Sequence, residues 1–389
     1  MTTRRRLPPG ARWVTLPSGA RRVELVVDVG RDPATGKRRQ TRRRYATLDE
    51  AIAAYNEIRG AVRAGTYVGR STVTVGELCD EWLAGRRKVR PSTLAGYRDA
   101  LKPVVAAYGA LPAQRLTKRH LTDLIDRLTA GTLLRADGRT RRPWSARTVN
   151  LMLFTLGQVL GDAVRQGVLV RNVAELVDRL PQTKREMATF TPAEVRKVLT
   201  AARRDRFEVA WHLALYGLRR GEIGGLAWSD IDFTAGTLTI RETNVAVEGR
   251  AVRSVPKTER GRRVLPLTPT LVEVLKRAKR RQAAERLRVG EAYQASGYVV
   301  VNEVGGQVHP DTLTDRWERL LAAAKVRRIR LHDARHTCAT LMHLQGVPTA
   351  VIAAWLGHAD AAFTVRTYAH SQVDALRAAA STLGSVTSA

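Results

Sequence analysis

The sequence contains little cysteine, no long hydrophobic run and few acidic residues, and each shortage limits what the protein can be. Only Cys79 and Cys338 are present, far apart in the 389-residue chain, so neither a disulfide framework nor a zinc site of clustered thiolates is expected. No apolar stretch approaches the roughly 18–20 residues of a membrane span. The N-terminal MTTRRRLPPG is followed by no signal core. We expect a cytoplasmic protein without a membrane partner.

The shortage of acidic residues makes the chain strongly basic. It has 66 Lys and Arg against 36 Asp and Glu, a formal net charge of +30. Residues 1–70, 71–185 and 186–389 each contribute an excess of 10 positive charges. A basic tail would concentrate the charge at one end, so this distribution indicates several folded units that lie along one polyanion, DNA or RNA.

The first 68 residues predict a small domain of a sheet and a helix. Residues 11–45 alternate apolar and polar side chains between turn signals, which predicts three strands. Residues 48–64 carry apolar side chains at helical spacing, so one helix is expected to pack on the sheet. A short ribbon of strands fits a DNA major groove, although a solvated edge strand shows the same pattern. We predict that DNA is contacted by five arginines of this sheet: Arg38, Arg39, Arg42, Arg43 and Arg44.

Residues 71–180 have the pattern of a compact helical bundle. Thr74 and Glu77 fit a capping box that opens the first helix. Pro91 opens the second helix, which Pro103 could kink or split. Two more helices are expected over residues 117–130 and 145–167, and residues 181–190 are interpreted as a linker.

Residues 191–389 are expected to form a further domain. Thr191 as N-cap, Pro192 at the first helical position and Glu194 at the third predict a helix start. A small antiparallel sheet is expected near residues 237–267, and the rest, to about Gly384, is mostly helical. The expected fold class is therefore multidomain and mainly α. It combines a three-stranded sheet with a helix, a central helical bundle and a C-terminal mixed α+β domain.

Four motifs of the last domain carry side chains suited to phosphate chemistry, and the first two supply an arginine and a lysine. In YGLRRGE, two glycines bracket Arg219 at a tight turn, where a fixed guanidinium suits bidentate contact with phosphate. Glu222, three residues on, could orient it by a salt bridge. In VPKTER, Lys257 lies in a predicted hairpin, from which it could protonate a leaving oxygen. Taken alone, an Arg–Glu pair is more often structural and a loop lysine is more often solvated.

The third motif, LHDARHTCATLMHLQG, contains three histidines. His332 and His336 are four residues apart, as in the HExxH motif of zinc proteases. Asp333 replaces the general-base Glu, however, and Arg335 would bring a positive charge beside the metal, so no metal site is expected. His332 and Arg335 can instead share a helix face near its N-terminus and bind an anion.

The fourth motif is WLGH, followed after one loop by TYAH. It supplies His358 and Tyr368. A tyrosine hydroxyl has a reference pKa of about 10, so it attacks phosphorus usefully only where cations and hydrogen-bonding groups favour the phenolate. A lone tyrosine near a histidine is usually structural.

The order of these motifs is more informative than any one of them. An arginine in GLRRGE, a hairpin lysine, HxxR, LGH and a tyrosine ten residues later resemble the tyrosine recombinase (phage integrase) family over residues 190–380. The upstream bundle resembles the family's SAM-like core-site-binding domain, and residues 1–68 resemble the arm-site-binding domain of phage and integrative-element integrases. The resemblance implies an integrase that cleaves and rejoins DNA at specific sites to integrate or excise a mobile element.

The resemblance also implies roles for single residues. Tyr368 would be the nucleophile that forms a 3′-phosphotyrosyl link, and Lys257 would protonate the departing 5′ oxygen. Arg219 and Arg335 would clamp the non-bridging oxygens of the phosphate and stabilise the charge of the transition state.

The remaining implied roles concern proton transfer, cofactors and partners. His332 would assist proton transfer at the tyrosine, His358 would donate a hydrogen bond to the phosphate, and Glu222 would support the site. No metal or nucleotide cofactor is implied, since the phosphotyrosine conserves the energy of the broken bond. Double-stranded DNA, a homotetramer that passes through a Holliday junction, a host DNA-bending protein and a directionality factor are the implied partners.

Three rival interpretations fit the residues less well. A catalytically silent DNA-binding regulator derived from a recombinase predicts loss of at least one of the six catalytic positions, and none is lost. A metal-dependent nuclease or hydrolase needs carboxylates among the histidines, where only Asp333 and Asp360 are close. A type IB topoisomerase shares the catalytic set, but the three-part layout and the LGH…Y spacing favour a recombinase.

Overall fold

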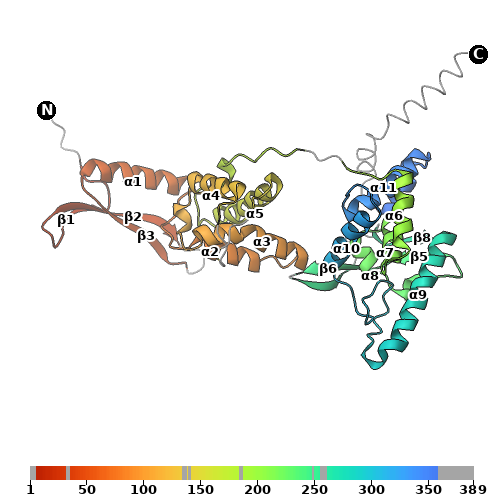
Figure 1. Cartoon of the computed structure of the whole chain (residues 1–389). Coiled ribbons are helices and arrows are strands. Elements are labelled where there is room, and N and C mark those ends of the chain that lie inside the picture. Colours follow the sequence, from red (N-terminus) through yellow and green to blue (C-terminus); the bar gives the residue numbers. More distant parts are fainter. Residues whose placement is uncertain are drawn as a thin grey trace, which may run out of the picture. The chain divides into compact units, whose positions relative to one another are not determined.

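The chain folds into two compact units with short sheets and many helices. The computed structural model describes residues 6–31, 36–133, 138, 142–183, 187–247, 249–254 and 261–357. The chain divides into Met1–Thr183 and Lys184–Ala389, a division that falls within residues 181–190. The fold class is multidomain and mainly α, as expected (Figure 1). Within the described ranges, every helix is too short or too polar to span a bilayer.

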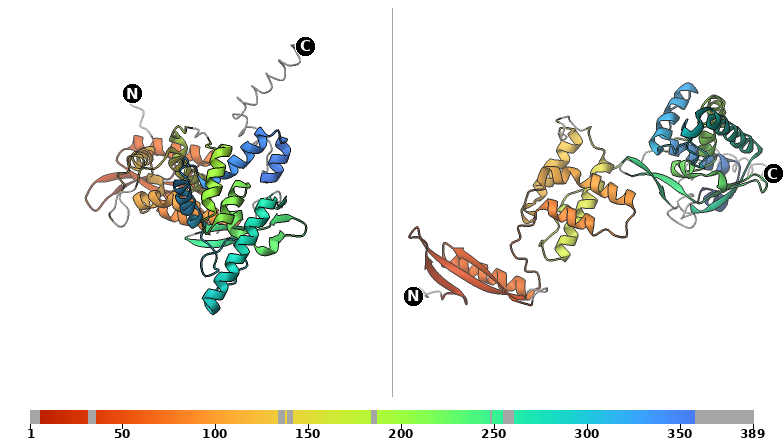
Figure 2. Two further views of the ribbon diagram at one scale, coloured as in Figure 1. Left: turned by 45° about the vertical axis from the view of Figure 1, so that its right-hand side comes forward. Right: turned by 90° about the horizontal axis from the view of Figure 1, so that it is seen from below.

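The first unit begins with an antiparallel sheet that a helix covers on one face (Figure 2). Four elements build it: β1 (Ala11–Thr15), β2 (Arg21–Arg31), β3 (Arg38–Tyr45) and α1 (Leu48–Arg63). Side chains alternate between the two faces of a strand. Leu25 and Val27 of β2 therefore point the same way, and they form a buried cluster with Ile58 of α1.

The rest of the first unit is a bundle of helices, where the sequence predicted them: α2 (Val75–Ala84), α3 (Pro91–Tyr108), α4 (Lys118–Ala130) and α5 (Ala146–Arg165). The predicted capping box is present, since the Thr74 N–H donates to Glu77 Oε2 at 2.8 Å and the Glu77 N–H donates to Thr74 Oγ1 at 3.2 Å. Helix α3 is not split at Pro103. The proline ring is buried, and this packing offsets the backbone hydrogen bond that proline cannot make.

The described part of the second unit has a larger set of helices and five short strands. Its helices are α6 (Pro192–Ala202), α7 (Glu208–Leu215), α8 (Arg220–Gly225), α9 (Pro269–Val289), α10 (Pro310–Ala323), α11 (Leu331–Leu344) and α12 (Thr349–Leu356). Its strands are β4 (Ile231–Asp232), β5 (Thr237–Ile240), β6 (Thr243–Val247), β7 (Arg250–Ser254) and β8 (Arg263–Pro266). The prediction that the rest of the domain, to about Gly384, is mostly helical lies outside the described residues beyond 357.

The prediction of one sheet over residues 237–267 is corrected. β5 pairs with β4 and β8, whereas β6 and β7 form a separate two-stranded ribbon. Alternation in the sequence marked the strands but not their partners. Leu238 of β5 lies opposite Leu265 of β8, and both leucines are buried in the core. Burial of this leucine pair favours the pairing of β5 with β8 over its pairing with β6, the next strand along the chain.

Aromatic side chains join four parts of the second unit into one core. Trp211 of α7 and Trp317 of α10 are fully buried, with ring centroids 5.6 Å apart. Phe190, before α6, lies 6.2 Å from Trp317, and its N–H donates to Thr337 Oγ1 of α11 at 3.0 Å. Ile223 of α8 and Ala334 of α11 belong to the same buried cluster, so both helices that carry predicted site residues pack on this core.

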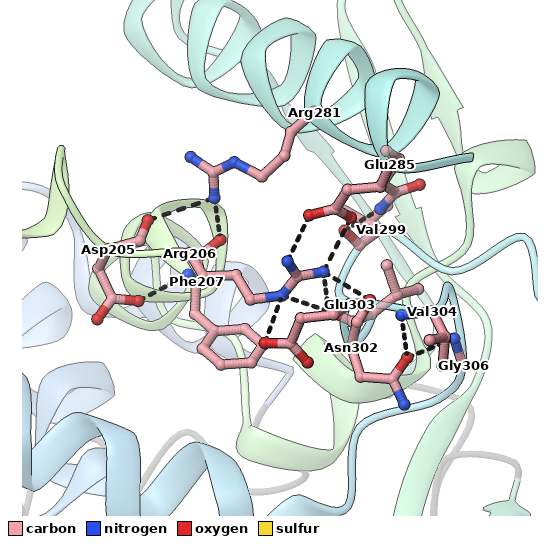
Figure 3. Close-up of polar contacts among 12 residues, drawn as sticks. Asp205, Arg206, Phe207, Arg281, Glu285, Val299, Asn302, Glu303, Val304 and Gly306 are labelled. Atoms are coloured by element: carbon pink, nitrogen blue, oxygen red, sulfur yellow. Dashed lines mark hydrogen bonds and ion pairs between the residues drawn. The ribbon is translucent and has the colours of Figure 1, made fainter. Parts of the chain in front are cut away.

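A buried ion pair fixes the long helix α9 to the turn before α7. Arg206 in that turn donates to both carboxylate oxygens of Glu285 on α9 (Figure 3). The same guanidinium donates to the Asn302 carbonyl at 2.5 Å, and Arg281 donates to the Arg206 carbonyl. Removing one partner of a buried pair typically costs ~3–5 kcal/mol, so this contact holds α9 and the loop around Asn302 in place.

Leu156→Ala tests whether the bundle has a core of its own. Leu156 of α5 is fully buried, so the substitution is expected to destabilise the bundle by about 2–5 kcal/mol. Hydrogen exchange of the full-length protein should become faster in α2–α5 and stay unchanged in α6–α11, because the two units have separate cores. Leu151→Ala, at a 46% exposed position of α5, is the control. Faster exchange in both units would contradict separate cores.

Candidate active site

One buried carboxylate, that of Glu222, lies at the centre of the predicted phosphate site. Arg219 immediately precedes α8, and its main-chain N–H donates to Glu222 Oε2 at 2.8 Å. The Arg219 guanidinium donates to Oε1 at 2.7 Å. The spacing of three residues thus produces the salt bridge that the sequence suggested, with a carboxylate that is 2% exposed.

Two more arginines reach this carboxylate from distant parts of the chain. Arg263 on β8 donates from Nη1 to Oε1 at 3.1 Å and from Nη2 to Oε2 at 3.0 Å. Nη1 of Arg335 on α11 lies 3.9 Å from Oε2 of Glu222. Cations repel one another more strongly when they are buried, so the negative charge of Glu222 is what allows the three arginines to lie together.

The same three arginines bind the end of α12. Its last carbonyls each accept a hydrogen bond: that of Trp355 from Arg263 Nε at 2.6 Å, that of Leu356 from Arg335 Nη2, and that of Gly357 from Arg219 Nη2 at 3.1 Å. Such carbonyls have no partner within their helix and form the negative end of its dipole, so cations are favoured there. The chain is held in this way up to the last described residue.

Close packing against α12 requires a glycine in the YGLRRGE turn. Gly217 has a φ of +99°, and a Cβ at this position would lie 2.9 Å from Leu356 Cδ2. The Gly217 carbonyl accepts a hydrogen bond from Arg335 Nη1 at 2.6 Å, and the Tyr216 carbonyl accepts one from Trp355 Nε1 at 2.9 Å. The turn that presents Arg219 is therefore fixed to both α11 and α12.

The arginines decide the protonation state of Glu222. Burial alone would raise its pKa, but the hydrogen bonds and charge of Arg263, followed by the charges of Arg219 and Arg335, outweigh burial. The pKa therefore lies below its ordinary value. Glu222 is a carboxylate at neutral pH and keeps its arginines in place.

Helix α11 brings His332 and Arg335 together near its N-terminus. His332 is exposed at the surface, yet partial burial of its ring and then the Arg335 charge lower its pKa. Its neutral form is the one that can accept a proton. Asp333, between them in sequence, is buried and pairs with Arg330 at 2.7 Å. The described residues include no group of three His, Cys, Asp or Glu side chains arranged to hold a metal ion.

His336 lies behind His332, and their rings meet edge to face with centroids 5.0 Å apart. Burial, followed by the neighbouring His332, lowers the pKa of His336 to about 4. His336 is therefore a neutral, buried residue of the α11 core.

Four of the residues predicted for the site are brought together: Arg219, Glu222, His332 and Arg335. Lys257, His358 and Tyr368 lie outside the described residues, so their places stay predictions. Sequence reasoning missed Arg263. The alternation of side chains along β8 could have indicated that Arg263 points inward. Leu265 is buried, and a residue two positions away on a strand points to the same side.

The five arginines predicted to contact DNA do not share one face of the N-terminal sheet. Alternation and register place Arg38, Arg42 and Arg44 on the open face, whereas Arg39 and Arg43 share the face that α1 covers. Two of the open-face arginines have acidic partners there, since Arg38 bonds Asp28 and Arg44 bonds Glu24. Arg12 of β1 also bonds Glu24, at 2.7 Å, and is an open-face cation that the prediction missed.

Residues 188–374 match the phage integrase family. The XerC-like tyrosine recombinase of Caldanaerobacter subterraneus is 27% identical over 377 residues, which cover 91% of this chain and 93% of that protein. The ICEBs1 integrase of Bacillus subtilis is 26% identical over 352 residues, covering 89% and 92% respectively. The match to the phage integrase family thus covers residues 188–374, and the curated relatives named integrase or tyrosine recombinase are similar to this chain over most of its length.

Solved structures with the same fold include two integrases. The Tn1549 transposon integrase in complex with transposon right end DNA has a TM-score of 0.63 at 19% identity, covering 80% of this chain and 99% of that one. A lambda integrase dimer bound to a COC′ core site has a TM-score of 0.55 at 17% identity, covering 94% and 96%.

The low pKa of His336 predicts a specific loss of stability in mild acid. Its folded pKa of about 4 lies below the unfolded value of 6.5, so folding favours the neutral ring. The corresponding stability is complete above pH 6.5 and is lost as the pH falls toward 4, by roughly 3 kcal/mol in total. Denaturant unfolding between pH 4.5 and 7.5 should show this slope, and His336→Gln should remove it. An unchanged slope in the variant would assign the acid sensitivity to other groups.

Proposed function

We propose that this protein is a site-specific DNA recombinase, an integrase that cleaves and rejoins DNA through a 3′-phosphotyrosyl intermediate. The observation that carries the proposal is the cluster of Arg219, Arg263 and Arg335 around Glu222, at the end of the helix that leads to His358 and Tyr368. Fixed cations such as Arg219 and Arg335 stabilise a phosphorane-like transition state, whose charge exceeds that of the phosphodiester. The match of residues 188–374 to the phage integrase family supports the same chemistry.

In the proposed reaction, Tyr368 attacks the scissile phosphorus while its proton passes to His332. The bond from phosphorus to the 5′ oxygen breaks, and Lys257 gives that oxygen a proton. The products are a phosphotyrosyl link to the 3′ side and a free 5′-hydroxyl. Attack by the 5′-hydroxyl of another strand reverses the steps and releases the tyrosine, so no external energy source is consumed.

Arg219 and Arg335 differ in how readily a phosphate can reach them. The Arg219 side chain is 37% exposed, whereas that of Arg335 is 1% exposed. Arg219 is therefore the arginine that a DNA phosphate contacts first. Arg335 is buried, with Nη1 and Nη2 donating to the carbonyls of Gly217 and Leu356, so contact with it requires the residues that cover it to move. His358 would add a hydrogen bond from the neighbouring position.

The proposed partner is double-stranded DNA, bound by four protomers on two duplexes. The net charge of +30 supports a polyanionic partner. A lambda integrase tetramer bound to a Holliday junction has this fold, with a TM-score of 0.57 at 17% identity. A host DNA-bending protein, a directionality factor and a cytoplasmic location stay predictions from the resemblance.

Tyr368→Phe tests the proposed nucleophile. Wild-type protein incubated with a nicked suicide substrate carrying its attachment site, in EDTA, should form a covalent adduct that denaturing gels detect. Tyr368→Phe should bind the same DNA without forming it, and Tyr55→Phe, in α1, should react as wild type does. An adduct from Tyr368→Phe would make another residue the nucleophile, and a wild type that binds but never reacts would favour a silent DNA-binding regulator.

We also propose that residues 1–68 bind arm-type sites and that residues 71–180 bind the core site. The open face of the N-terminal sheet, with Arg12, Arg38, Arg42 and Arg44, supplies the cations for the first of these. Removal of residues 1–65 is expected to spare cleavage at core sites but to weaken integration. Full integration by the truncated protein would argue against an arm-binding role.

Arg42→Gln refines this test to a single side chain. If Arg42 contacts a phosphate, its loss should lower the slope of log affinity against log salt by about 1 for arm-site DNA. Arg63→Gln, which removes the same charge from the exposed end of α1, is the matched control. Equal effects of the two substitutions would indicate a general electrostatic contribution instead of a contact.

A further inference from the structure

Arg263 has a position in the second unit that the reaction described above does not use. Its side chain is 7% exposed, and the hydrogen bonds of its guanidinium engage the two oxygens of Glu222 and the Trp355 carbonyl. The residue therefore joins three segments that are far apart in sequence: β8, α8 and the C-terminal end of α12. An arginine kept only for charge at the protein surface would have none of these contacts.

We infer that Arg263 is a positioning residue of the recombination site: it fixes the end of α12 against Glu222 and thereby sets the place of the phosphate-binding groups. The inference rests on the proposed function where its test measures activity. Each segment that Arg263 touches adjoins a predicted catalytic residue. Glu222 holds Arg219, β8 follows Lys257 by six residues, and Trp355 precedes His358 by three.

The guanidinium geometry is what the site requires. Two parallel N–H groups match the two carboxylate oxygens, while Nε donates to a carbonyl in a third direction. A lysine has one ammonium group and cannot make this planar, forked set of contacts. The Trp355 carbonyl would then lose its arginine, and the end of α12 would keep only the bonds of Arg335 to Leu356 and of Arg219 to Gly357. The Glu222 carboxylate, the partner of Arg219, would lose the arginine that holds both its oxygens.

Arg263 acts on position and not on the reacting atoms, because all three nitrogens of its guanidinium are engaged by the Glu222 carboxylate and the Trp355 carbonyl. Catalytic groups displaced by about 1 Å can lose on the order of 100-fold in rate while the substrate still binds. The inference therefore predicts a separation between DNA affinity and cleavage rate. A purely structural role would lower the amount of folded protein and would not separate the two.

The test compares Arg263→Lys with Arg262→Lys, which changes the exposed neighbouring arginine in the same way. At saturating suicide DNA, single-turnover adduct formation by Arg263→Lys should be slower by about 10- to 100-fold. Its dissociation constant for the DNA should stay within a few-fold of wild type, and Arg262→Lys should match wild type in both. A substrate with a neutral methylphosphonate at the scissile position should reduce the rate difference between Arg263→Lys and wild type. The groups displaced in the variant act by stabilising the charge of the phosphate, which this substrate lacks.

A readout without DNA separates the failure of this inference from the failure of the proposed function. Hydrogen exchange of the full chain should become faster at the end of α12 in Arg263→Lys and in Glu222→Gln, with α2–α5 unchanged. Faster exchange there supports the inference even if wild-type protein forms no adduct. The inference would be overturned if Arg263→Lys kept the wild-type rate of hydrogen exchange at α12. It would also be overturned if adduct formation by Arg263→Lys slowed only in proportion to a loss of folded protein or of DNA binding.

Discussion

The carboxylate of Glu222 is the charge on which the second unit's proposed chemistry depends. It lies at the crossing of α8, β8 and α11, and it neutralises arginines that would otherwise repel one another in a buried site. Those arginines hold the carbonyls that end α12. Geometry at the surface, where a phosphate would be bound, is thus determined by an ion cluster beneath it. The tight turn at Gly217 serves the same end, since its φ of +99° favours glycine and a Cβ there would lie 2.9 Å from Leu356 of α12.

The sequence predicted the elements well where the signal is local. Capping residues located α2 and α6, and the spacing of three residues between Arg219 and Glu222 gave their salt bridge. Contacts between distant residues were not predicted. Arg263 is 41 residues from Glu222 and bonds a main-chain oxygen 92 residues away. The period of two in β8 indicates the face on which Arg263 lies, but not these partners. The pairing of β5 with β8 was missed for the same reason.

The N-terminal arginines show a different limit. All five were predicted to contact DNA, but a strand sends neighbouring side chains to opposite faces, and α1 covers one of these. The period of two was available in the sequence. The sequence of β3 did not show which of its faces the helix covers. Arginines lie on both faces of this strand, with Arg39 and Arg43 on one and Arg38, Arg42 and Arg44 on the other. Only the packing of Ile58 on Leu25 and Val27 decides it.

Among the described residues, six carboxylates are buried but only one arginine and no lysine. The carboxylates are thus buried, while most of their arginine partners stay partly exposed. For Glu208, Glu222 and Glu285, for example, the partner arginines Arg277, Arg219 and Arg206 remain at least 20% exposed. A polyanion that approaches this protein therefore meets fewer acidic groups than the composition suggests. The same ion pairs that stabilise the interior remove repulsive charges from the surface, so folding itself makes the exterior more uniformly cationic.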